Sequence, residues 1–413
     1  MKVCMLTSSY PRFKGDCAGT CVGSLSETIA RLKHEVHVVA PYDPLVQPDP
    51  ESPVHIHRFR YVWSDDLCLV GHARSLVADV RLKPAVYPLT LLYLASAFQH
   101  LLRLHRRYHF DIIHAHWVLP NGPIAAVARR ITGVPVVIHL HGSDIFVSEH
   151  GPTFGTVARW VFHSADRVIA VGEDLLRRAV ALGLDPAIGQ SMPCGVDTKA
   201  YAPVPGGEME LRQDLGIEPT ELVVLALGRL VYKKGFDTLI RAIPQVVEQC
   251  PRARFVIAGG GHLYSSLSGL ARRLRVTDYL VMPGSIPWSD TPRYYSMADV
   301  LAVPSVVDSS GNVDGIPNVL LEGMAAGLPV VASRVAGIPA VVEDKVSGVL
   351  TPPGDVTSLV AALSRLLEDA NLRRRYGRSA RAKMVRDISW DRTARNVLGI
   401  YDSIIDPSPD KNS

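Results

Sequence analysis

The stretch Leu222-Val-Val-Leu-Ala-Leu-Gly-Arg-Leu-Val-Tyr-Lys-Lys-Gly235 decides the fold, because an unbroken apolar run leads directly into a glycine-bounded loop. The run is continuous rather than alternating, which indicates a strand buried on both faces of a parallel sheet. The amphipathic segment Thr238–Gln249 follows it and supplies a crossover helix. This order of strand, loop and helix predicts an α/β domain.

The same unit recurs along both halves of the chain, with helical stretches such as Thr357–Ala370 between apolar runs. The runs of the first half are Val3–Leu6, Val36–Ala40, Ile112–His114, Val134–Leu140 and Val168–Val171. Those of the second half are Leu222–Leu227, Phe255–Ala258, Tyr279–Met282, Val300–Val303, Val330–Ala332 and Val349–Leu350. We therefore predict two doubly wound parallel sheets, with ligands bound beyond the carboxyl ends of the strands.

The two series divide near residues 190–205, where Ser191–Asp197 and Pro203–Gly207 have the composition of a linker. We predict two Rossmann-like domains, one over residues 1–194 and the other over residues 195–388. Residues 389–413 are expected to form a crossover helix, from Ser389 to Ile405, and a tail. The tail Pro407–Ser413 is expected to fray.

Composition excludes several classes of protein. The chain has 413 residues, of which 47% are hydrophobic and 20% charged, which is typical of a globular protein. A net charge of +4, evenly spread, argues against nucleic acid as the partner. No cysteine pair has C-x-x-C spacing, and the N-terminus lacks a signal-peptide pattern. We expect a cytoplasmic protein with six reduced thiols: Cys4, Cys17, Cys21, Cys68, Cys194 and Cys250.

One basic, apolar segment has two readings. Its apolar part, Ala85–Phe98, is too short to span a bilayer. The wider segment Arg81 to His109 contains no acidic residue and five basic ones: Arg81, Lys83, Arg103, Arg106 and Arg107. It either lies on an anionic membrane surface or is a core helix with a solvated basic end.

The densest cluster of chemical groups is Asp314-Gly-Ile-Pro-Asn-Val-Leu-Leu-Glu322, in which two carboxylates flank a turn. Asn318 is expected to cap a helix and to leave the N–H groups of Val319 and Leu320 free for a phosphate. Glu322 could accept hydrogen bonds from sugar hydroxyls. The alternative is a capped helix with two surface acids.

A second cluster is the loop Gly228–Gly235, where Arg229 and Lys234 could reach a diphosphate. The alternative is a solvated lysine pair, and the loop is no Walker motif. A third is His139-Leu-His141-Gly-Ser-Asp144, whose His141 or Asp144 could touch a substrate unless the histidine is structural. His114-Ala-His116 would suit zinc, but no third ligand is evident, so no metal is predicted.

In this order, the motifs resemble the retaining glycosyltransferases of family 4, glycosyl transferases group 1, over nearly the whole chain. The hallmark acid pair of that family reads Asp314 and Glu322 here. Its companions are the G-R-x…K-G loop, the H-G-S-D turn, the turn Gly260–Gly261 and the helix that begins Ser389-Trp390. The resemblance implies the GT-B fold: two Rossmann-like domains that face a cleft, with the last helix crossing back. It also implies that residues 1–194 form the acceptor-binding domain and residues 195–388 the donor-binding domain.

The resemblance also implies retaining transfer of a hexosyl group from a nucleotide-diphosphate sugar to a saccharide or lipid-linked saccharide. Arg229 and Lys234 would bind the diphosphate and stabilise the departing charge. The backbone of Asn318, Val319 and Leu320 would help to hold the phosphates, and Glu322 would bind the ribose.

In the same family, Asp314 would hold the transferred sugar by its hydroxyls, and His141 would lie near the 6-hydroxyl of that sugar. Gly19 would let the first loop approach the phosphates. The chain departs from the family at Asp314, which replaces Glu, and at Thr20, which replaces the second of two glycines. Two further departures are Cys194 in place of Asn and Ala340 in place of Glu.

No D-x-D motif ends a strand, so we predict neither a metal nor another cofactor. A front-face displacement follows, in which the leaving phosphate deprotonates the acceptor. Two alternatives remain: an inactive nucleotide-sugar-binding subunit, and a GT-B nucleotide-sugar epimerase. The expected location is the cytoplasm, with the inner face of the cytoplasmic membrane as the site for a lipid-linked acceptor.

Overall fold

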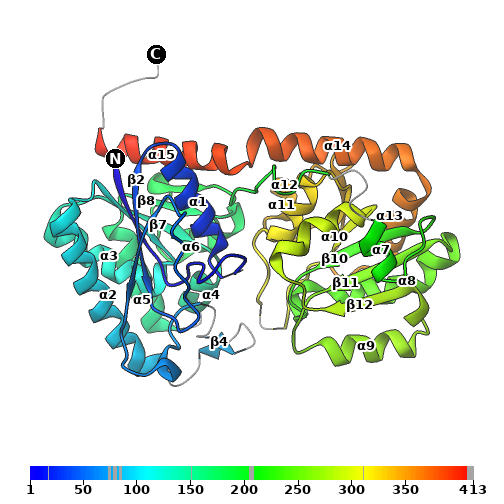
Figure 1. Cartoon of the computed structure of the whole chain (residues 1–413), viewed down its shortest axis with the longest axis horizontal. Helices are drawn as coiled ribbons and strands as arrows, with labels where there is room; N and C mark the ends of the chain where they lie inside the picture. Colours follow the sequence, from blue (N-terminus) through cyan, green and yellow to red (C-terminus); the bar gives the residue numbers. More distant parts are fainter. Residues whose placement is uncertain are drawn as a thin grey trace, which may run out of the picture. The chain divides into compact units, whose positions relative to one another are not determined.

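The structure is a computed structural model that describes residues 1–16, 18–72, 76–77, 81–82, 86–149, 151–203, 209–309 and 311–406. The chain forms two compact units, which are described separately (Figure 1). Unit 1 comprises Met1–Gly195 and Trp390–Ser413, and unit 2 comprises Val196–Ser389. These boundaries lie one residue from the predicted ones, and the last helix belongs to unit 1. The predicted fraying tail, Cys17 and Lys83 lie outside the described residues.

Unit 1 contains a seven-stranded parallel sheet in the order β3-β2-β1-β6-β7-β8-β9. Its strands are β1 (Lys2–Leu6), β2 (Glu35–Pro41), β3 (His55–Phe59), β6 (Ile112–His116), β7 (Val136–Leu140), β8 (Arg167–Ala170) and β9 (Gly189–Ser191). A short antiparallel pair, β4 (Leu76–Val77) and β5 (Arg81–Leu82), stands apart. The strand order reverses between β1 and β6, so this point is where ligands are expected.

Helices cover both faces of this sheet. One apolar core lies beneath α2 (Val86–Tyr108), α3 (Val118–Thr132), α4 (Ser143–Glu149), α5 (Pro152–Ser164) and α6 (Glu173–Ala181). The core of the other face lies beneath α1 (Thr20–Arg31) and α15 (Trp390–Ile405), which join parts of the chain far apart in sequence. Short 3-10 turns are η1 (Asp65–Leu67) and η2 (Pro186–Ile188).

The basic, apolar segment forms α2, a core helix. Its buried side chains recur every three to four residues: Val86, Leu89, Tyr93, Ala97, Leu101 and Leu104. Within the described residues, no helix has both the length and the apolar character needed to cross a bilayer. The side chain of Arg81 lies outside the described ones.

Unit 2 contains a six-stranded parallel sheet in the order β12-β11-β10-β13-β14-β15. Its strands are β10 (Leu222–Leu227), β11 (Ala253–Ala258), β12 (Leu280–Gly284), β13 (Val300–Val303), β14 (Val330–Ser333) and β15 (Gly348–Thr351). The order reverses between β10 and β13. The loops that follow these two strands therefore meet at the place where an α/β sheet binds its ligand.

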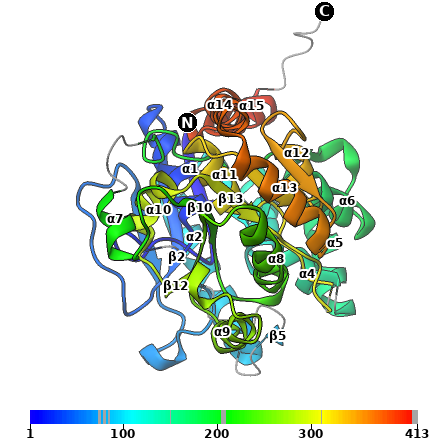
Figure 2. The ribbon, with the colours of Figure 1, turned by 90° about the vertical axis from the view of Figure 1, so that its right-hand side faces the viewer.

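The helices of unit 2 form a layer on each face of the sheet. One core packs against α8 (Phe236–Gln249), α9 (Tyr264–Arg273) and α13 (Val356–Glu368), and Figure 2 shows α8 and α13 side by side. The other packs against α7 (Met209–Asp214), α10 (Thr291–Met297), α11 (Asn318–Ala325) and α12 (Ile338–Val341). Residues of α14 (Ala370–Asp387) enter both cores. The 3-10 turns are η3 (Tyr232–Lys234), η4 (Thr277–Tyr279) and η5 (Trp288–Asp290).

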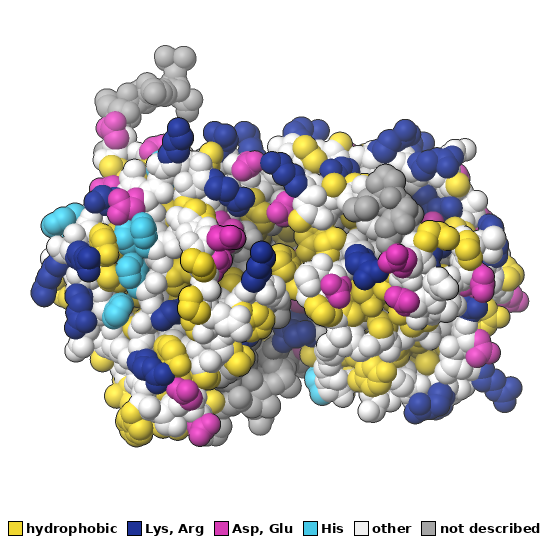
Figure 3. Space-filling view, viewed as in Figure 1, with side chains coloured by type: hydrophobic (Ala, Val, Ile, Leu, Met, Phe, Trp, Pro, Cys, Tyr) yellow, Lys and Arg dark blue, Asp and Glu magenta, His cyan; other side chains and the backbone are white. Residues whose placement is uncertain are grey.

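The two-sheet α/β fold predicted from the apolar runs is confirmed, and each of the eleven predicted runs overlaps a strand to within two residues at each end of the run. The prediction missed β3 and β9, which contain polar residues and lack a continuous apolar run. Positive and negative side chains are interspersed over the face shown in Figure 3.

Candidate functional site at the reversal points of the two sheets

In unit 2, the loop after β10 packs against the loop after β13. The N–H of Val306 donates to the carbonyl of Lys233 at 2.9 Å. Gly235 ends the first loop with φ of +65°, and a Cβ at this position would collide with the carbonyl of Pro304. Only glycine meets both requirements without strain. The sequence therefore fixes these loops against each other at the reversal point of the sheet.

This loop contact brings Lys233, Lys234 and Asp314 together. The Lys234 ammonium lies 2.6 Å from one oxygen of Asp314, and the Lys233 ammonium lies 3.4 Å from the other. The three side chains are only 12–14% exposed. Burial acts to raise the pKa of Asp314, but the two lysines outweigh it and hold the pKa below its usual value. Asp314 is therefore ionised at neutral pH, and Lys234 is its main partner in this state.

Glu322 lies inside a cage of aromatic donors. The Tyr295 hydroxyl donates to its carboxylate at 2.7 Å, and side chains of Tyr201 and Trp288 also hydrogen-bond to it. Burial raises the pKa of Glu322, while these bonds act in the opposite direction. A carboxylate offers about four acceptor positions, so this cage still leaves room for a ligand hydroxyl.

The start of α11 differs from the prediction. Asn318 does not cap the helix but is its first residue, and Pro317 occupies the cap position. The proline ring fixes φ near −66° while ψ is extended, so helical geometry begins only at the next residue. The expectation that the N–H of Leu320 is free is wrong, because it donates to the carbonyl of Pro317 at 3.0 Å.

In unit 1, Gly19 lies at the cap position of α1 with φ of +68°. A Cβ there would collide with the carbonyl of Ser9 in the loop after β1. Glycine is therefore required for this loop to pack on itself, whether or not a phosphate approaches it.

His141 follows β7 and lies against β6. Its Nε2 is 3.0 Å from Nδ1 of His116, and its ring centroid is 4.4 Å from that of Trp117. Removal from water, together with His139 and His114, holds the pKa of His141 well below its usual value. The imidazole is therefore neutral at pH 7 and can donate or accept a hydrogen bond, but it does not supply a positive charge.

Asp144 holds the turn that carries His141. Its buried carboxylate accepts the N–H groups of Val118 at 2.9 Å, Gly142 at 2.8 Å and His141 at 3.2 Å. The side chain is only 3% exposed. Of the two residues proposed to touch a substrate, His141 remains available, whereas Asp144 positions the backbone.

The third ligand that the H-x-H pattern lacked is present in the fold. His139 joins His114 and His116, and their potential ligand atoms lie within 4.8 Å of one another. Their ring planes, however, are nearly parallel, at 4° for His114 and His139 and 20° for His114 and His116. A metal must lie in the plane of each imidazole that binds it, so stacked rings do not converge on one ion. The Tyr401 hydroxyl lies 2.5 Å from Nδ1 of His114.

The prediction that every cysteine is reduced is wrong for Cys21 and Cys194, which form a disulfide in unit 1. They are 173 positions apart, so their spacing gives no signal. The fold nevertheless brings the first turn of α1 beside the segment after β9, with 6.4 Å between the two Cα atoms. Cys4, Cys68 and Cys250 are buried and belong to no disulfide.

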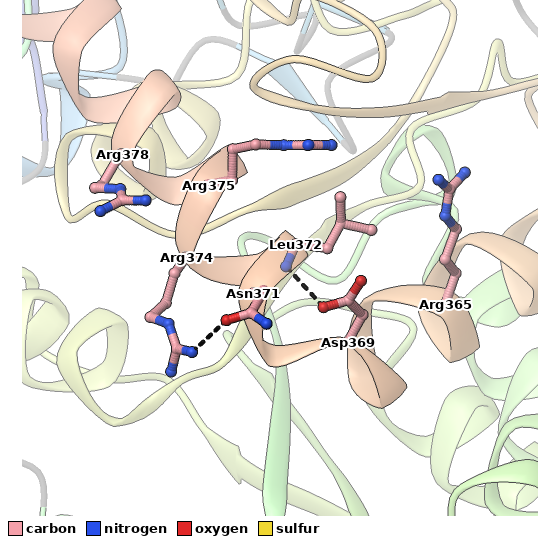
Figure 4. Close-up of a pocket in the computed structure, with 7 residues that line it drawn as sticks. All are labelled: Arg365, Asp369, Asn371, Leu372, Arg374, Arg375 and Arg378. Carbon is pink, nitrogen blue, oxygen red and sulfur yellow. Dashed lines mark hydrogen bonds between the residues drawn. The ribbon is translucent and has the colours of Figure 1, made fainter.

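A separate hollow of about 360 Å³ lies in unit 2 (Figure 4). It is lined by Arg365, Asp369, Asn371, Leu372, Arg374, Arg375 and Arg378. The Asp369 carboxylate accepts the N–H of Leu372, and Arg374 donates to Asn371. The arginine side chains point in different directions in Figure 4, and none of the predicted site residues lines the hollow.

The predicted site residues thus divide between the two units. Unit 1 contains Gly19 and His141; unit 2 contains Arg229, Lys234, Asp314, Asn318, Val319, Leu320 and Glu322. The sequence prediction missed Lys233 as a partner of Asp314, and it missed the donors around Glu322. Lys233 could have been suspected from its place beside Lys234. Tyr201, by contrast, lies in a stretch that resembled only a linker.

Two family models match the chain. "Glycosyltransferase Family 4" matches residues 18–200, and "Glycosyl transferases group 1" matches residues 208–383. The chain is 34% identical over 252 residues to a GDP-mannose-dependent alpha-(1-6)-phosphatidylinositol monomannoside mannosyltransferase of Mycolicibacterium smegmatis. That match covers 60% of this chain and 65% of the relative.

A D-inositol 3-phosphate glycosyltransferase of Actinosynnema mirum is 32% identical over 317 residues, with 72% of this chain and 73% of the relative covered. Among solved structures, Anabaena HepE in complex with UDP has a TM-score of 0.75 at 21% sequence identity. That similarity covers 98% of this chain and 100% of the solved chain, and at this identity it describes the fold.

Proposed function

The chain belongs to the family 4 glycosyltransferases of the GT-B fold, and we propose that it transfers a hexosyl group with retention. The donor is a nucleoside-diphosphate sugar, and the acceptor is a hydroxyl of a saccharide or lipid-linked saccharide. The observation that carries this proposal is the buried cluster of Lys233, Lys234 and Asp314 at the reversal point of the unit 2 sheet.

The charges of this loop suit a diphosphate. Arg229, Lys233 and Lys234 contribute three positive charges and Asp314 one negative charge, which leaves +2. When the donor binds, Lys234 exchanges part of its contact with Asp314 for a phosphate oxygen, and Asp314 becomes free to accept sugar hydroxyls. Phosphate oxygens replace a carboxylate oxygen as the partner of the same ammonium, so the lysine is never left without a counter-charge.

The reaction proceeds on one face of the sugar. The bond from the anomeric carbon to the β-phosphate oxygen breaks, and Arg229 and Lys234 stabilise the charge that develops on that oxygen. The acceptor oxygen then bonds to the anomeric carbon on the same face, and its proton passes to the departing phosphate. His141, as a neutral imidazole, hydrogen-bonds to the sugar. These cations supply the charge compensation, so we expect transfer without added metal.

Glu322 binds the ribose of the donor. Its carboxylate is fixed by Tyr295, Tyr201 and Trp288, so it loses little side-chain entropy when a ribose hydroxyl donates to it. Removal of the nucleotide sugar leaves the same three donors in place, so the carboxylate remains satisfied in both states.

The nucleotide base and the sugar of the donor can be identified with a thermal-shift screen. Relatives of the chain are named as GDP-mannose-dependent, and a structure of similar fold contains UDP. Thermal shifts with GDP, UDP, GDP-mannose and UDP-glucose would identify the nucleotide, since a ligand at 100 times its Kd stabilises the folded state by about 2.7 kcal/mol.

For the acceptor, α2 supports a lipid-linked saccharide at the inner face of the cytoplasmic membrane. Tyr87, Leu91 and Leu92 are 54%, 70% and 45% exposed, and Arg103, Arg106 and Arg107 are exposed farther along the same helix. Exposed apolar and basic groups together favour an anionic bilayer surface. Flotation with anionic liposomes tests this reading; absence of binding at low salt would refute it and leave α2 as a core helix only.

The function itself is tested with Lys234→Ala, measured as nucleotide release and as sugar transfer. We expect kcat/KM to fall by about 100- to 1,000-fold, as for the loss of one group that stabilises a developing negative charge. Lys199→Ala, at an exposed lysine of the same unit, is the matched control.

Near-normal kcat/KM in the Lys234 variant would remove this residue from the site. If the wild type binds a nucleotide sugar but releases no free nucleotide from it, the chain is an inactive binding subunit. Conversion of the donor sugar without an acceptor would indicate an epimerase. A loss of activity on chelation that magnesium restores would refute metal-independent transfer.

A further inference from the structure

We propose that Cys21, Cys194 and His141 form a redox-gated binding site for one thiophilic divalent cation, such as Zn²⁺. The potential ligand atoms of the three residues lie within 4.8 Å of one another, and all three side chains are partly exposed. The family resemblance does not explain the pairing of Cys21 with Cys194, because Cys194 stands where that family has Asn.

The ligand set is chemically suited to zinc. Two cysteine sulfurs and one imidazole nitrogen with a fourth, open position is an arrangement that zinc adopts in proteins. With Zn–S distances of about 2.3 Å, tetrahedral geometry requires about 3.8 Å between the two sulfurs. The Cα separation of 6.4 Å allows the sulfurs to take this spacing by rotation about the side-chain bonds once the disulfide is open.

The position of Cys21 in the fold suits a metal-bound sulfur. Cys21 is the second residue of α1, and the unpaired N–H groups at the start of a helix stabilise negative charge. Nε2 of His141 faces Nδ1 of His116 at 3.0 Å, and the ring packs against Trp117 and stacks on His139, so Nδ1 is the nitrogen that we assign as the metal ligand. In the stacked group of His114, His116 and His139, by contrast, all three rings are buried.

Oxidation and metal binding exclude each other at this site. In the structure the two sulfurs are joined, so two of the three ligands are used up. The oxidant is a low-molecular-weight disulfide such as oxidised glutathione. Two S–H bonds of the protein and one S–S bond of the oxidant are broken, while one protein S–S bond and two S–H bonds of the reduced oxidant form. Reduction reverses the exchange and restores the ligands.

The proposal has a consequence for catalysis that rests on the proposed function. A cation that takes a nitrogen of His141 prevents the imidazole from contacting the sugar, so zinc is expected to inhibit the reduced enzyme. The disulfide form is expected to be insensitive to zinc. Binding and inhibition can be measured separately, so a failure of the proposed function would leave the binding result standing.

The test titrates zinc alone into the whole protein, first reduced and freed of reductant, then oxidised with glutathione disulfide. We expect about one zinc ion per reduced chain in competition with a chromophoric chelator, and none per oxidised chain. Cobalt, as a substitute, should give a thiolate-to-metal charge-transfer band in the reduced form only. Cys21→Ser and Cys194→Asn should each weaken zinc binding by more than about 100-fold, because loss of a second-shell partner alone costs 10- to 100-fold.

Cys68→Ser is the matched control, since Cys68 is a buried cysteine of the same unit that belongs to no disulfide. For each protein, transfer activity with zinc is divided by transfer activity without zinc. This ratio should fall below one only for the reduced wild type and the reduced control. Equal zinc binding by the oxidised protein would overturn the proposal and point to the histidine group. No binding by the reduced wild type, or loss of binding in the control, would also overturn it.

Discussion

Tyr295→Phe removes one hydrogen-bond donor from the cage around Glu322, together with a longer contact of 3.3 Å to the carbonyl of Val319. The change removes the hydroxyl that donates to the carboxylate at 2.7 Å and leaves the aromatic ring, so no cavity forms. A hydrogen bond to a charged group contributes about 1.5–3 kcal/mol and one to a neutral group about 0.5–1.5 kcal/mol. The loss of stability should therefore be about 2 kcal/mol where Glu322 is ionised and about 1 kcal/mol where it is protonated.

The sign of the pH dependence follows from the direction of the shift. Burial raises the pKa of folded Glu322, so between the pKa of about 4.3 in the unfolded chain and the higher folded value, the folded state binds more protons. In that window the contribution of Glu322 to stability falls as pH rises. Without the Tyr295 hydroxyl the folded pKa rises further, so the difference between variant and wild type grows with pH.

Differential scanning calorimetry at pH 4 and pH 8 measures this difference in the transition of unit 2. For a unit of this size each kcal/mol shifts Tm by about 2–4 °C, so we expect a decrease of about 4–8 °C at pH 8 and about half of that at pH 4. Tyr294→Phe, at the neighbouring buried tyrosine, is the control. Equal shifts at the two pH values would refute the argument that Tyr295 stabilises an ionised carboxylate.

Three further changes test other parts of the structure. Gly235→Ala should lower the free energy of unfolding by at least about 3 kcal/mol, because strain at positive φ adds to the collision with Pro304. Gly216→Ala, with φ of +67° and open space, should lower it by only about 1–2 kcal/mol. Equal losses in denaturant unfolding would contradict the collision. Tyr401→Phe should lower the stability of unit 1 by about 1 kcal/mol through loss of the His114 contact, and an unchanged Tm for that unit would show that the contact contributes nothing. At saturating donor, Lys234→Ala should release nucleotide at a rate close to background, whereas Lys199→Ala should not. The two variants should differ little in Tm if Lys233 keeps its ion pair with Asp314.

The two sheets could be predicted from the sequence because most of their strands are buried on both faces and form continuous apolar runs. Runs such as Leu222–Leu227 and Val300–Val303 carry no polar interruption, and both coincide with strands. The edge strand β3 was not predicted because its residues, His-Ile-His-Arg-Phe, are mostly polar. A strand with one partner can expose half of its side chains, so hydropathy does not mark it.

For the site, loops at the ends of strands were predictable, but contacts within them were not. The sequence places Lys234 and Asp314 after different strands, and strand order alone brings them to one point. Their mutual ion pair depends on side-chain reach, whereas the position of the helix cap at Pro317 rather than Asn318 depends on the backbone dihedral angles of the proline. The disulfide joins positions 173 apart, and no local pattern could reveal it.

The placement of α15 sets an order on synthesis. Val397, Ile400 and Tyr401 cover the same apolar face as Val3 and Met5, so the packing of the first strand is completed only when the last helix has been synthesised. Unit 2 has all of its elements between Val196 and Ser389 and can close before the chain is complete. Until α15 is synthesised, the part of this apolar face that α15 covers beside α1 is exposed, and a stop codon before Trp390 would leave it exposed permanently.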